Sequence, residues 1–577
     1  MPAPSTSLML TLLSFGGDPA AIGVVPTYTK DVAPILYRHC SACHGAIDNP
    51  ARVALLSYET ARAAASAIRA QVGKRTMPPW SADPAHSLKF RNDARLSDGD
   101  VATVLGWIDG GTPEGNAADL PALPDDPQSW RSPLQRPPDA IVSLPEIHIA
   151  AHGEIPYIQQ LIKVPVPEDR WITAMQMRAG NRNLLHHMGI TEVALPGGMG
   201  PKEIGEFATV ARNLGIPEGA LADESPAVMD SANANAYDML GVYTPGTTLE
   251  VFANDSGKLL KGGSNYYLNF NIHYTTTGKP ESDRSQLALW FRSTPPRHQL
   301  FRAPVAINTI IADGQELLTD APGTKAEGTQ VAIPPIAPYT KNYQLIGMSA
   351  FTRPVTIYQL QPHAHMRARD FRYQLVYPDG RQLTLLTVPA YDFHWQLAYQ
   401  LEQPLEVPAG SKLIVTAHYD NSLDNYRERI AADDPGRNCG PENLVYFRPQ
   451  NQTWDEMFSP LAQYAVADDA DAAAPGRPAL RTVQVVGCLA PGRAQAWLLT
   501  RAGAPVTTES QATSATELQA SATRPLGAGR FALLGTSVFD LRSRSGHKVA
   551  IKGVLIEDGA SRRINLTSLQ SLAAGCN

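Results

Sequence analysis

The stretch Asn265–Gly278, which reads NYYLNFNIHYTTTG, alternates polar and apolar side chains and ends in a Thr- and Gly-containing turn. Alternation with a period of two predicts a half-buried β-strand. Thr356–Met366 (TIYQLQPHAHM) and Lys412–Ser422 (KLIVTAHYDNS) have the same character. Short strands of this kind, separated by Gly, Pro, Asn and Asp turns from about residue 141 to residue 464, predict β-sandwich architecture.

The motif CSACH near the N-terminus places Cys40, Cys43 and His44 in a C-x-x-C-H pattern. This is the pattern of c-type haem attachment, in which two thiols bond the vinyl groups and the imidazole becomes the proximal iron ligand. A thioredoxin-like redox pair and half of a zinc site are the alternatives. No βαβ pattern surrounds the motif and no second Cys/His pair lies nearby in the sequence, so we expect a covalently bound haem c.

A second iron ligand is expected in the segment KRTMPPW (74–80), where Met77 precedes two prolines and Trp80. A thioether on the distal side raises the potential of a c-type haem, and Trp80 is expected to shield it. His39 and His86 are the alternative distal ligands.

Helical signals surround these motifs. Lys30–His39 has helical periodicity, and Ser97 with Asp100 forms a capping-box pattern ahead of an apolar run that ends at Gly110 and Gly111. This part of the chain resembles a class I cytochrome c domain, which is all-α. The resemblance implies a haem c held by Cys40, Cys43, His44 and Met77.

His363 and His365 form an H-x-H pattern within the strand-like run at 356–366. Side chains two apart on a β-strand point to the same face, so both imidazoles are expected to reach one metal ion. Met457, in the later stretch QTWDEMF, adds a thioether. Two imidazoles and a thioether suit copper, because sulfur favours Cu(I) and imidazole binds both oxidation states.

A second group of histidines consists of His186 and His187 in NLLHHMGI, and His273 in NFNIHYTTTG. Adjacent side chains on a regular strand point in opposite directions. The pair must therefore lie at a bend or a strand end if both imidazoles are to bind one metal ion. On geometry alone this is the weaker of the two predicted metal sites.

The order HHMG, IHY, PHAHMR and DEM resembles that of the ascorbate-dependent type II copper monooxygenases, the family of peptidylglycine α-hydroxylating monooxygenase and dopamine β-monooxygenase. The resemblance covers about residues 141–464. It implies two consecutive jelly-roll-like β-sandwiches, each carrying one copper ion across a solvent-filled cleft. It assigns the electron-transfer copper to His186, His187 and His273, and the catalytic copper to His363, His365 and Met457.

The chain departs from that family in ways that bear on its substrate. The peptide hydroxylase anchors a substrate carboxylate with an arginine two residues before the H-x-H, where this chain has Gln361. The animal enzymes are rich in disulfides, whereas this region contains only Cys439. Peptide amidation is therefore not expected. The insertion RNCGPENLVYFRPQ (437–450) ahead of the DEM motif is expected to shape the substrate cleft.

The 577 residues, with two low-complexity stretches, predict a multidomain and mainly β protein. Strand-like runs such as TVQVVGCL and KVAIKGVLI predict a barrel at the C-terminus. We expect a tail or vestigial leader at 1–25, a cytochrome c domain at 26–118, a Pro-rich linker at 119–140, copper-monooxygenase β-sandwiches at 141–303 and 304–465, a linker at 466–480 and a small β-barrel at 481–577.

Composition limits the classes of binding partner and the cellular compartment that we expect. A net charge of −6 without a basic stripe excludes nucleic acid, and no apolar run is long enough to span a membrane. Cys488 and Cys576 pair in a disulfide or remain buried free thiols, with Cys439 single in either case. Leu8–Phe15 is similar to the apolar part of a signal peptide but lacks a preceding Lys or Arg. Since haem attachment and copper loading are periplasmic in bacteria, we expect a periplasmic or secreted protein.

Together these motifs predict a copper-dependent monooxygenase that hydroxylates a C–H bond of a small organic substrate with O2. Its cofactors would be a covalent haem c and two copper ions. Electrons would come from an external donor, such as a cytochrome, a quinol-linked carrier or an ascorbate-like reductant, and pass through the haem to the first copper. The alternative is a non-catalytic haem/copper electron-transfer or copper-handling protein.

Overall fold

The computed structural model shows a mainly β protein, as the sequence predicts, with several sheets and a few helices. It describes residues 25–45, 53–124, 129–130, 135–153, 155, 157–194, 238–245, 249–253, 255–320, 331–434, 436, 438–447, 452–467, 480–493, 496–559 and 561–576. The expected leader at 1–25 and the linker at 466–480 lie almost wholly outside the described residues. None of the described helices is long and apolar enough to cross a membrane.

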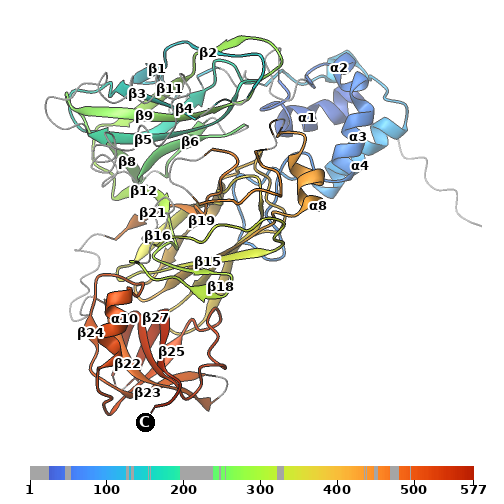
Figure 1. Cartoon of the computed structure of the whole chain (residues 1–577). Coiled ribbons are helices and arrows are strands. Elements are labelled where there is room, and N and C mark those ends of the chain that lie inside the picture. Colours follow the sequence, from blue (N-terminus) through green and yellow to red (C-terminus); the bar gives the residue numbers. More distant parts are fainter. Residues whose placement is uncertain are drawn as a thin grey trace, which may run out of the picture.

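Four α-helices form a unit of their own near the N-terminus, drawn in blue in Figure 1. They are α1 (Ala33–His39), α2 (Tyr58–Ala63), α3 (Ala65–Gly73) and α4 (Asp98–Asp109), with a π-helical turn η1 (Tyr28–Val32) before α1 and a 3-10 turn η2 (Ala117–Asp119) after α4. The predicted capping box is confirmed, since the Ser97 hydroxyl accepts from the backbone N–H of Asp100. Their apolar faces pack around the buried Trp107.

The first β-sandwich follows the helical unit. One of its layers contains β3 (Ile158–Lys163), β9 (Tyr266–Tyr274), β5 (Leu185–Ala194) and β6 (Met239–Tyr243), in that order. The other layer contains β1 (Ala140–Ser143), β11 (Gln286–Arg292), β4 (Arg170–Arg178) and β8 (Ser256–Leu260), with β7 (Leu249–Val251) beside β4. A separate pair is formed by β2 (Ile147–Ile149) and β10 (Glu281–Asp283). Apolar side chains from both layers form one core.

The second β-sandwich shares a sheet with the first. From β8 the nine-stranded sheet continues through β12 (His298–Pro304), β21 (Leu461–Val466), β16 (Val355–Gln361) and β19 (Tyr399–Val407). The connection is the short parallel pairing of β8 with β12. Backbone hydrogen bonds therefore link the two sandwiches directly, which fixes the position of each relative to the other.

The other layer of the second sandwich is a six-stranded sheet that covers its own large apolar core. Its order is β14 (Gln315–Glu316), β13 (Thr309–Ala312), β15 (Tyr343–Ala350), β20 (Lys412–Tyr419), β17 (Ala368–Val376) and β18 (Gln382–Val388). The short helix α8 (Leu423–Asn425) and the π-helical turn η4 (Tyr426–Ile430) follow β20.

The segment after α3 joins the helical unit to the second sandwich. Phe90 forms a β-bridge with Leu401 of the edge strand β19, and the Leu88 N–H donates to the Leu385 carbonyl of the edge strand β18. Trp80 packs edge-on against Tyr399, with ring centroids 4.9 Å apart. The large apolar surface of Trp80 therefore covers the edge of the second sandwich, while its shielding of a haem stays a prediction.

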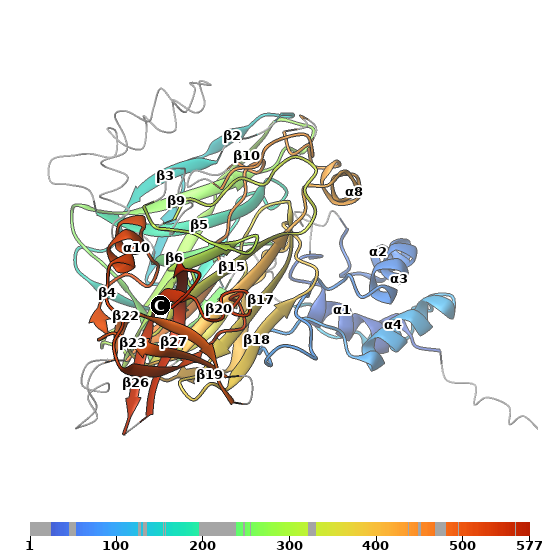
Figure 2. The same ribbon diagram turned by 60° about the horizontal axis from the view of Figure 1, so that its bottom comes forward.

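The last part of the chain packs against the second sandwich (Figure 2). Its strands run in the order β23 (Trp497–Ala502), β25 (Gly529–Leu534), β27 (Ser561–Ala573), β26 (Lys548–Asp558), β22 (Arg481–Pro491) and β24 (Val506–Thr507), with helix α10 (Ala515–Ala522) alongside. Additional pairing of β22 with β23 closes the sheet on itself. The buried Lys412 of β20 donates to the Gly535 carbonyl across this interface, which fixes the barrel on the sandwich.

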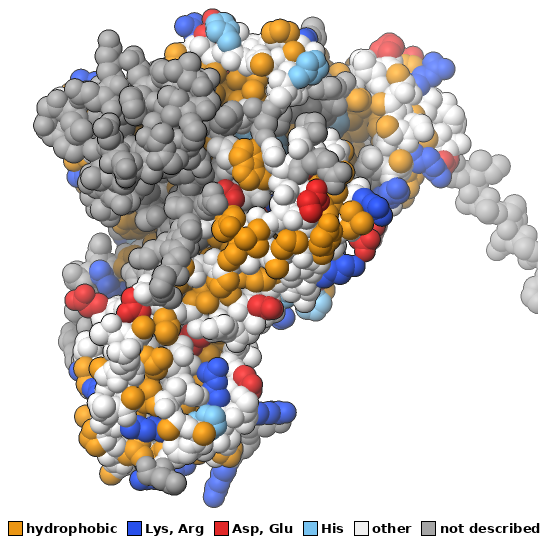
Figure 3. Space-filling view, in the orientation of Figure 1, with side chains coloured by type: hydrophobic (Ala, Val, Ile, Leu, Met, Phe, Trp, Pro, Cys, Tyr) orange, Lys and Arg blue, Asp and Glu red, His pale blue; other side chains and the backbone are white. Residues whose placement is uncertain are grey.

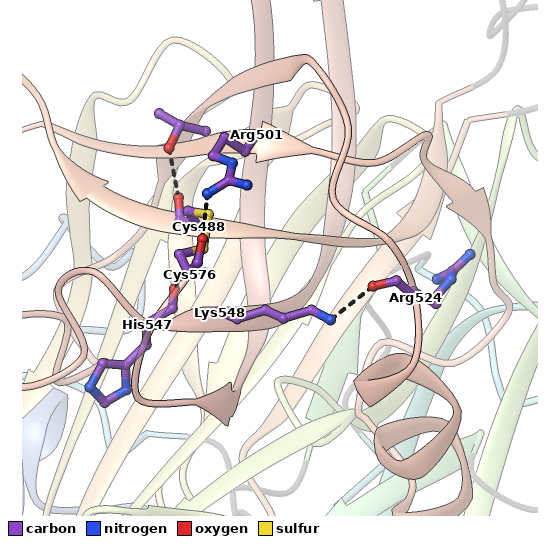
Figure 4. Close-up of a disulfide and its surroundings, with 7 residues drawn as sticks. Cys488, Arg501, Arg524, His547, Lys548 and Cys576 are labelled. Atoms are coloured by element: carbon purple, nitrogen blue, oxygen red, sulfur yellow. Dashed lines mark hydrogen bonds between the residues drawn. A yellow bond between two sulfur atoms is a disulfide. The ribbon is translucent and has the colours of Figure 1, made fainter.

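A disulfide joins Cys488 of β22 to Cys576, so of the two alternatives left open by the sequence, pairing is the one found (Figure 4). Cys439 is buried and forms no disulfide. Arg501 donates to the Cys576 carbonyl beside the disulfide. The bond closes the C-terminal segment of the barrel onto its first strand.

Replacing both Cys488 and Cys576 by serine is expected to destabilise the barrel by about 3 kcal/mol, because the unfolded chain loses a cross-link that closes a long loop. Differential scanning calorimetry would show a lower melting temperature for the barrel transition. The Cys439→Ser variant serves as control, since Cys439 takes no part in a disulfide. An unchanged barrel transition in the double variant would contradict a stabilising disulfide.

Acidic and basic side chains are interspersed over the face shown in Figure 3. Lys and Arg do not form a continuous stripe among the coloured residues of that face.

Candidate functional site

The first histidine group lies on two paired strands of the first sandwich. His186 and His187 stand at the start of β5, and His187 lies opposite His273 of β9 in the strand register. The pairing shifts register between Leu185 and His187, so the strand is irregular at this point. This is the strand-end position that two adjacent histidines need in order to face one metal ion. The ligand atoms of the three imidazoles lie within 4.8 Å of one another.

The nitrogen atoms of this group converge. The Nδ1 atoms of His186 and His187 are 2.9 Å apart. Nδ1 of His273 and Nε2 of His186 are buried and have no hydrogen-bond partner within the described parts of the chain. Buried nitrogen atoms without partners are costly, and a metal ion bound by them would remove that cost. These three residues therefore fit a metal site.

Burial also keeps these imidazoles neutral, which is the form that binds metals. It lowers the pKa of His186 to about 3, and it lowers the pKa of both His187 and His273 well below the usual value. Neighbouring histidines add to each of these shifts. A neutral imidazole keeps a lone pair available at neutral pH.

The second group lies in a loop, which corrects the expectation that the H-x-H is on a strand. Strand β16 ends at Gln361, and β17 begins only at Ala368. Pro362 explains the difference, because it has no N–H with which to continue the ladder. The His363 and His365 rings are 5.9 Å apart and nearly perpendicular, so the loop rather than a strand directs them to one place.

The structure brings His363, His365 and Met457 together as predicted. Nε2 of His363 is 3.1 Å from Sδ of Met457, while its Nδ1 is 2.6 Å from Oε1 of Gln396. Nδ1 of His365 is 3.1 Å from the Asp455 carbonyl oxygen, and its Nε2 is buried with no partner among the described residues. Both rings are thus held through Nδ1 and present Nε2, an arrangement typical of metal-ligating histidines. Burial lowers the pKa of His363 to about 4 and of His365 to about 3.

Glu456 organises this second group, and sequence reasoning missed it. Its buried carboxylate accepts from the backbone N–H groups of His365, Arg367 and Met457, so one side chain holds both the H-x-H loop and the thioether. Burial raises the pKa of Glu456 to about 7. The sequence signal for this role is the DEM motif itself, in which Glu456 directly precedes the methionine.

The two histidine groups adjoin each other. The ring centroids of His187 and His363 are 6.2 Å apart, and Tyr157 stacks on His273 while lying 6.4 Å from His365. Phe393 stacks on His186. The resemblance implied two sites on opposite sides of a solvent-filled cleft. That expectation is corrected here, because buried aromatic rings fill the space between the groups.

His394 lies at the edge of this cluster. Its ring is 5.6 Å from that of His186. Its nitrogens contact the carboxylates of Asp392, at 3.0 Å, and Asp433, at 3.4 Å. The hydrogen bond that the His394 ring donates to Asp392 raises the pKa of His394, in contrast to the lowered pKa of the fully buried histidines. Spacing alone could not reveal this, because the contact forms between the two sandwiches.

The C-x-x-C-H motif lies at the C-terminal end of α1 in the helical unit. Cys40 and Cys43 are both free and half-buried, and burial raises the pKa of both thiols. Nδ1 of His44 is 2.8 Å from the Val53 carbonyl oxygen. This hydrogen bond fixes the imidazole with Nε2 available for a metal. Two unpaired thiols beside such an imidazole fit covalent haem attachment.

The candidate distal ligands differ in their surroundings. Met77 is half-buried in the loop that follows α3. His39 is the last residue of α1. His86 is already engaged, since its Nδ1 is 2.6 Å from the Asp83 carboxylate. Ligation of the haem iron by Met77 stays a prediction.

No protein-family model matches the chain, and no curated protein matches it either.

Proposed function

We propose that the protein is a copper monooxygenase that hydroxylates a C–H bond of a small organic substrate with O2. The observation that carries this proposal is the convergence of His363 Nε2 and Met457 Sδ, together with the buried Nε2 of His365, which has no partner among the described residues. Two imidazoles and a thioether form a ligand set for copper, with coordination positions left over. Copper bound there supplies the activation of O2.

The residues of the site have separate tasks in this proposal. Gln396, the Asp455 carbonyl and Glu456 hold the ligating side chains in place. Tyr157 and Phe393 exclude water from the space between the histidine groups. The overall reaction consumes O2, two electrons and two protons, and it yields the hydroxylated substrate and one water molecule. His186, His187 and His273 would hold a second copper that supplies those electrons one at a time.

The haem would be the entry point for electrons. Cys40, Cys43 and His44 would hold it in a class I cytochrome c domain, with Met77 as distal ligand, and the two sandwiches would be jelly rolls of the copper monooxygenase kind. A Met-ligated haem has a potential high enough to suit transfer to Cu(II). An external donor reduces the haem. The Cys488–Cys576 disulfide is compatible with a periplasmic or secreted protein.

Isotope labelling tests this proposal. The haem- and copper-loaded protein would be supplied with ascorbate, ¹⁸O2 and a panel of small organic compounds. We expect one ¹⁸O atom in the product for each O2 consumed. Apoprotein without copper is the control.

The second candidate is an electron-transfer or copper-handling protein. The burial of the ligands favours it, since His365 is only 1% exposed. In that case the loaded protein would bind two copper ions and exchange electrons with the haem, but no compound would gain ¹⁸O. Incorporation of label into any product decides for the monooxygenase.

A further inference from the structure

A buried arginine of the first sandwich contacts the haem-attachment motif. Arg182 is 6% exposed, and its guanidinium donates to the carbonyl oxygen of Ala42. Ala42 stands between the two cysteines of the motif. The contact therefore joins the helical unit to the first sandwich at the point where the haem would be bonded.

The same arginine is close in sequence to the first histidine group. It belongs to the turn that leads into β5, whose first residues include His186 and His187. Hydrogen bonds fix this turn, with the Asn181 N–H donating to Asp283 at 2.6 Å and the Asn183 N–H to the Asn181 side chain at 3.0 Å. Arg182 is thus held rigidly between the cysteine motif and the histidines.

Among the described residues, no carboxylate forms an ion pair with Arg182. Its charge opposes the rise that burial causes in the pKa of Cys43. Burial raises the pKa of Tyr243 to about 12, and Arg182 opposes that rise as well. Burying a guanidinium costs free energy, and the hydrogen bond to Ala42 offsets part of that cost at the haem-attachment motif.

We propose that Arg182 is the positioning residue that docks the haem-attachment motif on the copper-binding strand and sets the route of electrons between them. The proposal rests on the proposed function. With a haem held by Cys40, Cys43 and His44 and a copper ion held by His186, His187 and His273, electrons would pass by way of the Ala42–Arg182 contact and the turn into β5. Each transfer would oxidise one haem iron from Fe(II) to Fe(III) and reduce one copper from Cu(II) to Cu(I), and the external donor would return the haem to Fe(II).

The positive charge of Arg182 is also expected to affect the midpoint potential of the haem. A cation near the haem edge favours the reduced iron, which carries one positive charge less, and therefore raises the midpoint potential. Replacement by methionine removes both the hydrogen bonds and the charge. Replacement by lysine keeps the charge but loses the planar guanidinium fork. The two variants thus separate positioning from charge.

The experiment uses the full chain carrying haem and copper, with Arg182→Met, Arg182→Lys and, as matched control, Arg69→Met. Arg69 is half-exposed on α3 and pairs with Asp109 within the helical unit. Protein with reduced haem and Cu(II) is mixed anaerobically in a stopped-flow instrument. We expect haem oxidation to slow by about ten- to a hundredfold in Arg182→Met, the scale on which small misplacements act in reactions that need exact geometry. The control should react as the wild type does.

Two further measurements complete the test. The haem midpoint potential should fall in Arg182→Met and stay near the wild-type value in Arg182→Lys, while transfer in Arg182→Lys is still slowed. The Cu(II) EPR spectrum should be the same in all variants. Wild-type rates and an unchanged potential in Arg182→Met would overturn this role. Failure of the proposed function is a different result, in which the wild type transfers electrons normally yet no product gains ¹⁸O.

Discussion

Removing the thioether of Met457 is expected to abolish O2-dependent hydroxylation while the absorbance of the haem stays unchanged. Loss of a residue that only supports a metal ligand costs about 10- to 100-fold, so loss of a ligand itself should cost at least the upper figure. The sulfur is 3.1 Å from His363 Nε2, and it is the soft donor that favours Cu(I). Alanine offers no donor atom.

Met457 is 9% exposed, so its replacement by alanine removes the sulfur ligand and also leaves a cavity. A second variant is needed to separate the loss of the ligand from the loss of packing. Met457→Leu conserves volume without sulfur, so it should lose activity as Met457→Ala does. Met366→Ala is the matched control, since Met366 follows the H-x-H but packs against Tyr426 and Ile430. Turnover would be measured as O2 uptake coupled to product. Full activity in Met457→Leu would remove the thioether from the ligand set.

His187→Ala is expected to block electron transfer from the haem to the first copper, whereas reduction of the haem by an external donor should continue. His187 faces His273 across the strand pair and is the member of its group that lies 6.2 Å from His363. Without it the first copper loses a ligand at the point nearest the second group. An external donor should still reduce the haem at the wild-type rate. Reoxidation of that haem by O2 in the presence of substrate should fail.

Stopped-flow absorbance of the haem bands, with pre-reduced protein mixed against O2, measures this directly. His148→Ala is the control, because His148 lies in the same sandwich but bonds to Ser282 at an exposed position. Equal reoxidation rates in wild type and His187→Ala would mean that the haem serves another purpose. Impaired reduction by the external donor would instead indicate damage to the helical unit.

Local patterns in the sequence predicted the local features well. The capping box at Ser97 and the alternating run at 265–278, most of which forms β9, follow from interactions between residues near one another in the chain. The need for a strand end at His186 and His187 was also foreseeable, because the direction of neighbouring side chains follows from backbone geometry. The prediction that the H-x-H pattern lies on a strand was wrong for a local reason, since Pro362 ends the strand before His363.

Other features depended on contacts between distant segments. The sequence could not show that Trp80 covers the edge of the second sandwich, or that Glu456 holds the loop of His365. Pairing of Cys488 with Cys576 was one of two possibilities until the barrel brought the thiols together. Such contacts join residues far apart in the chain, and spacing carries no information on them.

The sequence by itself determined the mainly β class and the types of donor atom available, because alternation, turns and ligand chemistry are properties of short stretches. Only the tertiary structure decided how those donors are arranged. The shared sheet between the sandwiches places His187 beside His363, and the docked helical unit places Ala42 on Arg182. Both contacts arise when whole layers pack, since burial of apolar surface and pairing of strand edges select one arrangement of the layers.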